Sequence, residues 1–154
     1  MRQFFCLAVF CLFCTAPGLH AETPATWEAR SEQGKHFASV QTAQGVTVIL
    51  NFEAGKSSTS LFVSGLWPTR PLDLRLYVTY ANGQRAYIDT FRFAKVLKTG
   101  SGATAYTMVM PNAQLRPLRG GDVLVIEDLK KRTQVPLTGS AKAIKAAQAS
   151  ASGS

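Results

Sequence analysis

The sequence predicts an all-β protein with mainly antiparallel strands, folded as a small β-sandwich or partly open barrel with a short C-terminal helix. Short runs of apolar, β-branched and aromatic residues recur along the chain, separated by segments rich in Gly, Pro, Asn and Ser. One pair of runs flanks Asn82-Gly83, a dipeptide typical of β-hairpin turns. The composition changes after residue 139, where alanine and lysine favour a helix.

The N-terminal segment has the three parts of a secretory signal peptide. Arg2 is followed by an apolar run over residues 4–14 and then by small residues up to Ala21, after which we expect cleavage. The run is shorter than the ~20 apolar residues that span a bilayer, and we expect no transmembrane segment in the mature chain. Cleavage after Ala16 fits less well, and a lipid anchor on Cys14 is disfavoured because bulky Leu and Phe precede it.

Cleavage after Ala21 divides the chain into a signal peptide (1–21), a single β-rich domain (22–149) and a disordered tail (150–154) of small residues. All three cysteines lie in the signal peptide, at Cys6, Cys11 and Cys14. The mature chain is therefore predicted to have no disulfide, no thiolate metal site and no cysteine nucleophile. Its hydrophobic core alone must then hold the domain together.

The first half of the mature chain contains four candidate strands. They span residues 27–31, where polar and apolar residues alternate, 36–40, 46–52, which is rich in β-branched residues, and 60–67. The third run is almost entirely apolar, which suits a strand in the middle of a sheet. Pro68 and Pro71 end the fourth strand because proline cannot donate to a strand ladder.

The next two strands form the clearest local structure. Apolar and polar residues alternate over residues 72–80, and the return strand occupies residues 85–93. We expect a two-residue loop at Asn82-Gly83, in which both residues have positive φ.

The register of this hairpin follows from the loop length. A two-residue loop places Val78 opposite Tyr87 on the apolar face. It also places Asp89 opposite Leu76, among apolar side chains. A β-bulge, a sheet margin or a functional carboxylate would each explain this mismatch.

The remaining elements follow from the same patterns. Strands are expected over residues 105–110, 122–127 and 133–137, and a helical turn over residues 112–116. Residues 94–102 are ambiguous. Pro136 indicates an edge position for the last strand. A helix is expected over residues 140–149, with Ser140 as its N-cap.

The chain is basic, with 17 Lys and Arg residues against 9 Asp and Glu residues and a formal charge of +8. Loss of Arg2 with the signal peptide lowers the charge by one. An exported protein rarely meets nucleic acid, so we expect no nucleic-acid partner. The expected partners are an envelope protein, a polysaccharide or another anionic surface, although the excess charge also serves solubility.

No motif in the sequence predicts a catalytic site. His36 is the only histidine of the mature chain, and neither Gly-x-Ser-x-Gly nor a phosphate loop occurs. The hairpin register places Asp73 opposite Arg92 and on the other face from Asp89, so the two carboxylates are a poor catalytic pair. We therefore predict no enzyme, no metal site and no cofactor, with a hydrolase based on one of these aspartates as a minor alternative.

The acidic pair Glu127-Asp128 is followed directly by the basic run Lys130-Lys131-Arg132. These cations oppose the binding of calcium, which needs clustered oxygen ligands. The segment is therefore predicted to be a turn in which the acidic and basic side chains pair with one another.

The candidate binding residues are aromatic or charged side chains of the strands and of one proline-bounded loop, namely Trp67, Arg70, Tyr77, Tyr87 and Asp89. Aromatic rings on a sheet face stack on sugars or peptides, and the alternative role for each of them is core packing. Trp67 has the best chance of exposure because it opens the loop 67–71. Together with Arg70, it would hold a partner by apolar contact and charge.

The layout resembles the invasion-associated locus B family of exported bacterial proteins. The resemblance rests on Trp27-Glu28-Ala29-Arg30 just after the signal peptide, on the Leu-Arg-Gly-Gly-Asp-Val-Leu-Val run over residues 118–125 and on the closing residues 135–144. Members usually carry cysteines after the tryptophan, where this chain has Ser31. The resemblance implies a non-enzymatic β-domain of the periplasm or outer surface, tied to host-cell interaction, with no catalytic residue to transfer.

These observations predict a non-enzymatic, exported binding or accessory protein of the bacterial envelope, periplasmic or secreted, in host or surface interaction. The alternative is a periplasmic inhibitor or immunity protein that blocks an enzyme with the loop 67–71. Both interpretations place the function in binding rather than in catalysis.

Overall fold

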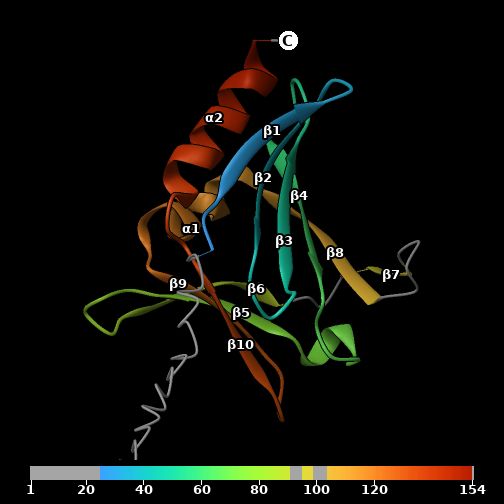
Figure 1. Ribbon diagram of the computed structural model, residues 1–154, viewed down its shortest axis with the longest axis vertical. Helices are drawn as coiled ribbons and strands as arrows, with labels where there is room; N and C mark the ends of the chain where they lie inside the picture. Colours follow the sequence, from blue (N-terminus) through green and yellow to red (C-terminus); the bar gives the residue numbers. More distant parts are fainter. Residues whose placement is uncertain (1–24, 91–94, 99–103, 154) are drawn as a thin grey trace, which may run out of the picture.

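The computed structural model describes residues 25–90, 95–98 and 104–153, with only the backbone at residues 89 and 90. Its strands form two antiparallel sheets, and a C-terminal helix packs against the first of them (Figure 1). Each sheet ends in an edge strand on both sides, so neither closes into a barrel. The predicted class, mainly antiparallel β with a short C-terminal helix, is confirmed.

Sheet A contains six strands in the order β1-β2-β3-β4-β8-β7. Their bounds are Glu28–Glu32 (β1), Lys35–Gln41 (β2), Thr47–Phe52 (β3), Ser58–Ser64 (β4), Lys95–Lys98 (β7) and Thr104–Pro111 (β8). Buried residues alternate with partly exposed ones along β3 and β4, so one face of the sheet lies on the core. The apolar strand β3 pairs on both sides, which confirms its predicted interior position.

Sheet B contains four strands in the order β10-β9-β5-β6 and crosses below sheet A in Figure 1. Its strands are Arg75–Thr79 (β5), Arg85–Thr90 (β6), Val123–Glu127 (β9) and Arg132–Pro136 (β10). β10 is an edge strand, as Pro136 predicts. The strands β5 and β9 lie between neighbours on both sides.

The loop of the β5–β6 hairpin differs from the predicted two-residue turn. The N–H of Tyr80 donates to the carbonyl of Gln84, and the N–H of Gly83 donates to that of Tyr80. Only Gly83 takes positive φ, at 80°, whereas Asn82 does not. The hairpin therefore has a three-residue loop that ends in a left-handed glycine.

The longer loop shifts the register near the turn by one residue. Tyr87 pairs with Tyr77, so the predicted pairing of Tyr87 with Val78 is wrong. A β-bulge between the pairs of Leu76 and Tyr77 restores the predicted register beyond it, and Leu76 lies opposite Asp89. Of the three explanations for that mismatch, the structure shows two, the bulge and the sheet margin, because β6 is an edge strand of sheet B.

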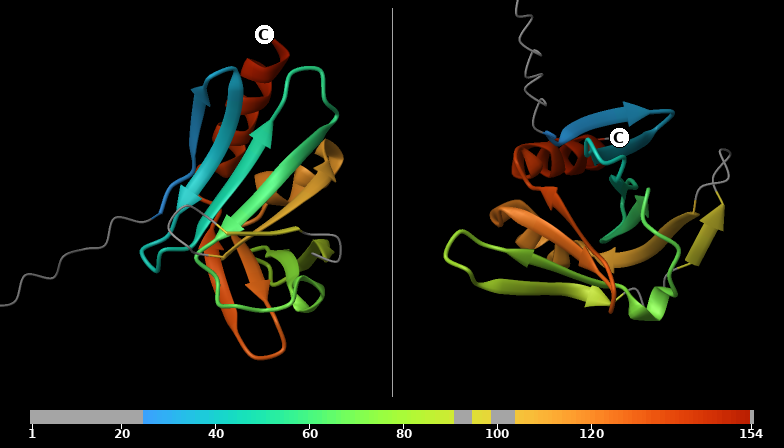
Figure 2. Two further views of the ribbon diagram at one scale, coloured as in Figure 1. Left: turned by 90° about the vertical axis from the view of Figure 1, so that its right-hand side faces the viewer. Right: turned by 60° about the horizontal axis from the view of Figure 1, so that its bottom comes forward.

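Within the described residues, three short helical segments and one longer helix accompany the strands. They are the 3-10 turns Pro71–Asp73 (η1) and Asn112–Leu115 (η3), the helix Arg116–Gly120 (α1) and the helix Ser140–Ser152 (α2). α2 lies beside β1 and β2, as Figures 1 and 2 show from different sides. No helix in the described part of the chain is long and apolar enough to cross a membrane.

Both ends of α2 correct the sequence prediction. Gly139, at φ 81°, is the N-cap residue, and Ser140 is buried and donates its hydroxyl to the carbonyl of Leu118 at 2.7 Å. The helix continues to Ser152, so residues 150–152 are helical rather than disordered. The reason is that Ala151 is buried one turn after Ala147 on the face that packs against sheet A.

The two sheets share a single hydrophobic core that Trp27 closes. Its side chain is 4% exposed, and its Nε1–H donates to the carbonyl of Pro136 at 2.9 Å. Its backbone N–H donates to the carbonyl of Thr138 at 3.1 Å. Trp27 therefore joins the start of sheet A to the last strand of sheet B and the segment that leads into α2.

Candidate binding site

The connection from sheet A to sheet B and the turn between β9 and β10 enclose a pocket of about 440 Å³. Residues 65–74 pass from β4 to β5, and residues 128–131 join β9 to β10. We call this hollow the Trp67 pocket, and its lining residues are Trp67, Pro68, Thr69, Arg70, Asp73, Asp128, Leu129, Lys130 and Lys131. The structure thus brings Trp67 and Arg70, both predicted from the sequence, into one site.

Trp67 is held in place rather than projecting from its loop. The indole is partly buried, packs against the core and donates its Nε1–H to Asp128 Oδ2 at 2.5 Å. The other carboxylate oxygen accepts the backbone N–H groups of Lys130 and Lys131, each at 2.7 Å. One carboxylate therefore shapes the β9–β10 turn and fixes the aromatic wall of the pocket.

A buried tyrosine from sheet A fixes the floor of the same loop. Tyr106 of β8 is fully buried, and its hydroxyl both accepts the N–H of Thr69 and donates to the carbonyl of Thr69, each at 3.0 Å. The backbone beside Trp67 is therefore held from below by a core residue. Such support keeps the pocket preformed before any ligand binds.

Arg70 pairs within its own loop. Its guanidinium contacts Asp73 at 2.8 and 3.2 Å, and this contact raises the pKa of Arg70. Asp73 lies in η1, not in a strand, because Pro71 starts a 3-10 turn there. The predicted partner of Asp73, Arg92, lies outside the described residues, so that pairing stays a prediction.

The basic run of the β9–β10 turn behaves differently from the prediction. Lys130 and Lys131 are exposed, and within the described ranges neither ammonium group makes an ion pair. Asp128 accepts their backbone N–H groups instead of their charged ends. The expected pairing of acidic and basic side chains in this turn is therefore wrong, and the two cations face the solvent at the pocket rim.

The hydrogen bonds around Asp128 lower the pKa of its carboxyl group to about 2, first through the Lys130 backbone N–H and next through Trp67. A carboxyl group with a lowered pKa stabilises the fold above its ordinary value of 3.8, and this contribution is lost as the pH falls towards 2. We expect Trp67→Phe to move the pKa of Asp128 upward, measured by ¹³C NMR of its carboxyl carbon.

Trp27→Phe is the control for this titration, because its indole bonds Pro136 and not Asp128. It should leave the midpoint of Asp128 unchanged. An identical midpoint in the wild type and in Trp67→Phe would show that the indole does not hold the carboxylate.

Tyr77 and Tyr87 lie on the face of sheet B opposite to that of Leu76 and Val78, which we call the outer face, and Tyr77 is fully buried there whereas Tyr87 is exposed. Tyr77 and Tyr87 are neighbours there, with ring centroids 5.8 Å apart. The backbone of Asp89 lies in β6 opposite Leu76, and its side chain is outside the described residues. The five candidates therefore divide between the Trp67 pocket, the outer face of sheet B and one side chain that stays undescribed.

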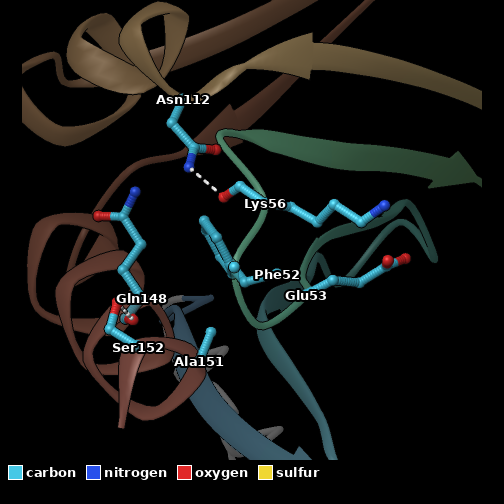
Figure 3. A pocket seen from close by; sticks show the side chains of 8 residues that line it. Phe52, Glu53, Lys56, Asn112, Gln148, Ala151 and Ser152 are labelled. Atoms are coloured by element: carbon cyan, nitrogen blue, oxygen red, sulfur yellow. Dashed lines mark hydrogen bonds between the residues drawn. The ribbon is translucent and has the colours of Figure 1, made fainter. Parts of the chain in front are cut away.

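A second hollow, of about 510 Å³, was not predicted from the sequence (Figure 3). It lies between the turn after β3, the start of η3 and the end of α2, and its lining includes Glu53, Lys56, Asn112 and Gln148. The amide of Asn112 donates to the carbonyl of Lys56 at 3.4 Å, the contact drawn in Figure 3. Its two charged side chains have opposite signs, so this hollow shows no preference for one class of ion.

A serine and a histidine also meet in the β1–β2 hairpin. Ser31 Oγ lies 2.9 Å from His36 Nδ1, because the two residues are opposite one another in the ladder. The register alone accounts for this contact. Among the described residues, no three His, Cys, Asp or Glu side chains gather into a group able to hold a metal ion.

Comparison with known proteins gave no match to a family model, a curated protein or a solved structure. The resemblance to the invasion-associated locus B family therefore stays a prediction from the sequence.

Proposed function

We propose that the protein is a non-enzymatic binding module of the bacterial envelope, periplasmic or secreted, which holds an anionic ligand in the Trp67 pocket. One observation carries the proposal. Both carboxylates of the pocket are already engaged, Asp73 by Arg70 and Asp128 by Trp67 and the backbone. The ammonium groups of Lys130 and Lys131 make no ion pair among the described residues, and together with Arg70 they give the pocket lining a net charge of +1 beside an apolar wall.

The test compares two variants that lose the same charge. Lys130→Gln with Lys131→Gln removes the rim cations, and Lys142→Gln with Lys145→Gln removes two exposed cations of α2. We expect the first variant, immobilised and exposed to envelope extract, to retain about tenfold less anionic material than the second. Equal retention by the two variants would refute the proposal.

The alternative, an inhibitor or immunity protein with loop 67–71 as its plug, has less support. A residue that blocks an enzyme must project from the surface of the inhibitor into the active site of the target. The indole of Trp67 instead packs against the core and bonds Asp128, so the exposed residues of the loop are Pro68 and Arg70, with Leu72 just after it. Leu72, expected on the apolar face of a strand, lies in η1 and is 62% exposed.

A further inference from the structure

We infer that the ligand of the Trp67 pocket is a linear acidic polysaccharide that continues from the pocket across the outer face of sheet B. The inference rests on the proposed function and names the class of its ligand. Four observations support it. They are the pairing register of sheet B, the absence of ion pairs to the arginines on its outer face among the described residues, the exposed ring of Tyr87, and the direct connection of the pocket residues to the strands of this face.

The register places three arginines around a pair of tyrosines. Arg75 pairs with Glu127, which pairs in turn with Arg132 on the other side. Two residues further along β5, Thr79 pairs with Arg85, and between these two rows lies the pair of Tyr77 and Tyr87. Residues two apart on a strand and residues directly opposite share a face. The three guanidinium groups therefore belong to the same side of the sheet.

None of these arginines makes an ion pair within the described part of the chain. Glu127, the acidic residue between Arg75 and Arg132, accepts the hydroxyl of Tyr77 at 3.0 Å. The guanidinium of Arg85 lies over the ring of Tyr77, 5.1 Å from its centroid, and not beside a carboxylate. The face therefore carries positive charge that a ligand can compensate.

Burial and the nearby Glu127 raise the pKa of Tyr77. The hydroxyl therefore stays protonated and remains a donor to Glu127 at neutral pH. Among the described residues Glu127 makes no ion pair with Arg75 or Arg132, and its single negative charge leaves the face with a net charge of +2 from the three arginines. Glu127 on the face and Asp128 in the pocket are therefore alike. Each accepts a hydrogen bond from an aromatic side chain and makes no ion pair among the described residues.

Tyr87 provides the apolar part of the surface. Its side chain is 69% exposed, and its ring meets that of Tyr77 at 49°, which supports it from one side. An exposed ring between guanidinium groups suits a polymer whose units combine an apolar ring face with a negative charge.

The position of the charges favours a polysaccharide over an acidic peptide. Peptides commonly bind sheets by adding a strand to an open edge. Arg75 and Glu127 lie on β5 and β9, and each of these strands already pairs on both sides. Recognition at the centre of this face must therefore come from side chains and not from strand addition.

The pocket and the face are continuous along the chain. Lys130 and Lys131 lead directly into Arg132 of β10, and Glu127 directly precedes Asp128. Along β5 the positions of Arg75 and Thr79 are separated by roughly 14 Å, at about 3.4 Å per residue. A ligand that contacts both the pocket rim and Arg85 must therefore be several sugar units long.

The experiment measures the binding of polygalacturonate oligomers of increasing length by calorimetry. We expect the affinity of the wild type to rise with length until the oligomer spans the face. Arg75→Gln with Arg85→Gln should lower the affinity for long oligomers about tenfold and leave that for the shortest ones unchanged. Lys130→Gln with Lys131→Gln should weaken both, whereas Lys142→Gln with Lys145→Gln should weaken neither.

Tyr87→Ala tests the aromatic contact without a change in charge. It should lower the affinity for long oligomers, and Tyr87→Phe should restore it. Because Tyr87 is largely exposed, the fold should tolerate both variants, and circular dichroism will verify this.

Different results overturn the inference and the proposed function. If the arginine variant binds long oligomers as the lysine control on α2 does, the ligand is confined to the pocket and the inference fails alone. Polyglutamate or phosphatidylglycerol vesicles that bind more tightly than polygalacturonate would also overturn it, in favour of a peptide or a membrane. If the wild type does not bind polygalacturonate at all, the inference is likewise overturned. The proposed function fails only if the pocket variant retains envelope material as its control does.

Discussion

Replacement of Trp27 by alanine is expected to lower the free energy of unfolding by about 3–5 kcal/mol. The side chain is 4% exposed within the shared core, so its removal leaves a cavity where the two sheets meet. The substitution also leaves the carbonyl of Pro136 without its indole donor. Urea unfolding followed by circular dichroism measures the effect as a lower midpoint with an unchanged slope.

Trp27→Phe separates the two contributions to this loss. Phenylalanine keeps most of the buried ring and removes the hydrogen bond to Pro136, and we expect a loss of about 1–2 kcal/mol. A loss in Trp27→Ala no larger than in Trp27→Phe would mean that the ring adds nothing to the core. The alanine variant should also expose the interface between the sheets to proteolysis.

Gly65→Ala is expected to lower the free energy of unfolding by about 2–4 kcal/mol. Gly65 follows β4 with φ +79°, a conformation that side chains rarely adopt. A Cβ atom at this position would lie 2.2 Å from the carbonyl oxygen of Gly45. The contact is with backbone, so a shift of the chain must relieve it.

Gly83→Ala provides a matched control for this effect. Gly83 has φ +80°, and a Cβ atom there would meet nothing within 4 Å. The control therefore contains the cost of the left-handed backbone, about 1 kcal/mol, without the steric contact. Similar losses in the two variants, compared by urea unfolding, would contradict the structural explanation for Gly65.

The substitution at Gly65 is expected to affect the Trp67 pocket as well as the stability of the fold. Trp67 lies two residues further along the chain, and a shift that relieves the contact with Gly45 moves the connection that carries the indole. We therefore expect Gly65→Ala to weaken ligand binding at the Trp67 pocket, whereas Gly83→Ala leaves it unchanged.

Local patterns in the sequence predicted the elements well where neighbouring residues decide the outcome. The apolar run 46–52 is an interior strand, and Pro136 lies on an edge strand. The register of the β5–β6 hairpin was wrong because Asn82-Gly83 fits both a two-residue loop and the end of a three-residue loop. Only the packing of the strands selects between these two.

The candidate site was predicted in part. Trp67 and Arg70 do line a pocket, and Tyr77 lies beside Tyr87. The contribution of Asp128 was missed because it lies 61 residues from Trp67. An aspartate that accepts the N–H groups two and three residues later is typical of an Asx turn, as Asp128 does with Lys130 and Lys131. The prediction for this segment rested on its charges alone and therefore did not include these hydrogen bonds.

The sequence by itself determined the alternation of buried and exposed residues, and with it the strands, the terminal helix and the antiparallel class. These features depend on residues that are neighbours along the chain, whose side chains point alternately to the two sides of a strand. The tertiary structure alone decided which loops meet and which carboxylates are already bound. Both depend on distant segments packing together, as Trp67 with Asp128 and Tyr77 with Glu127 do.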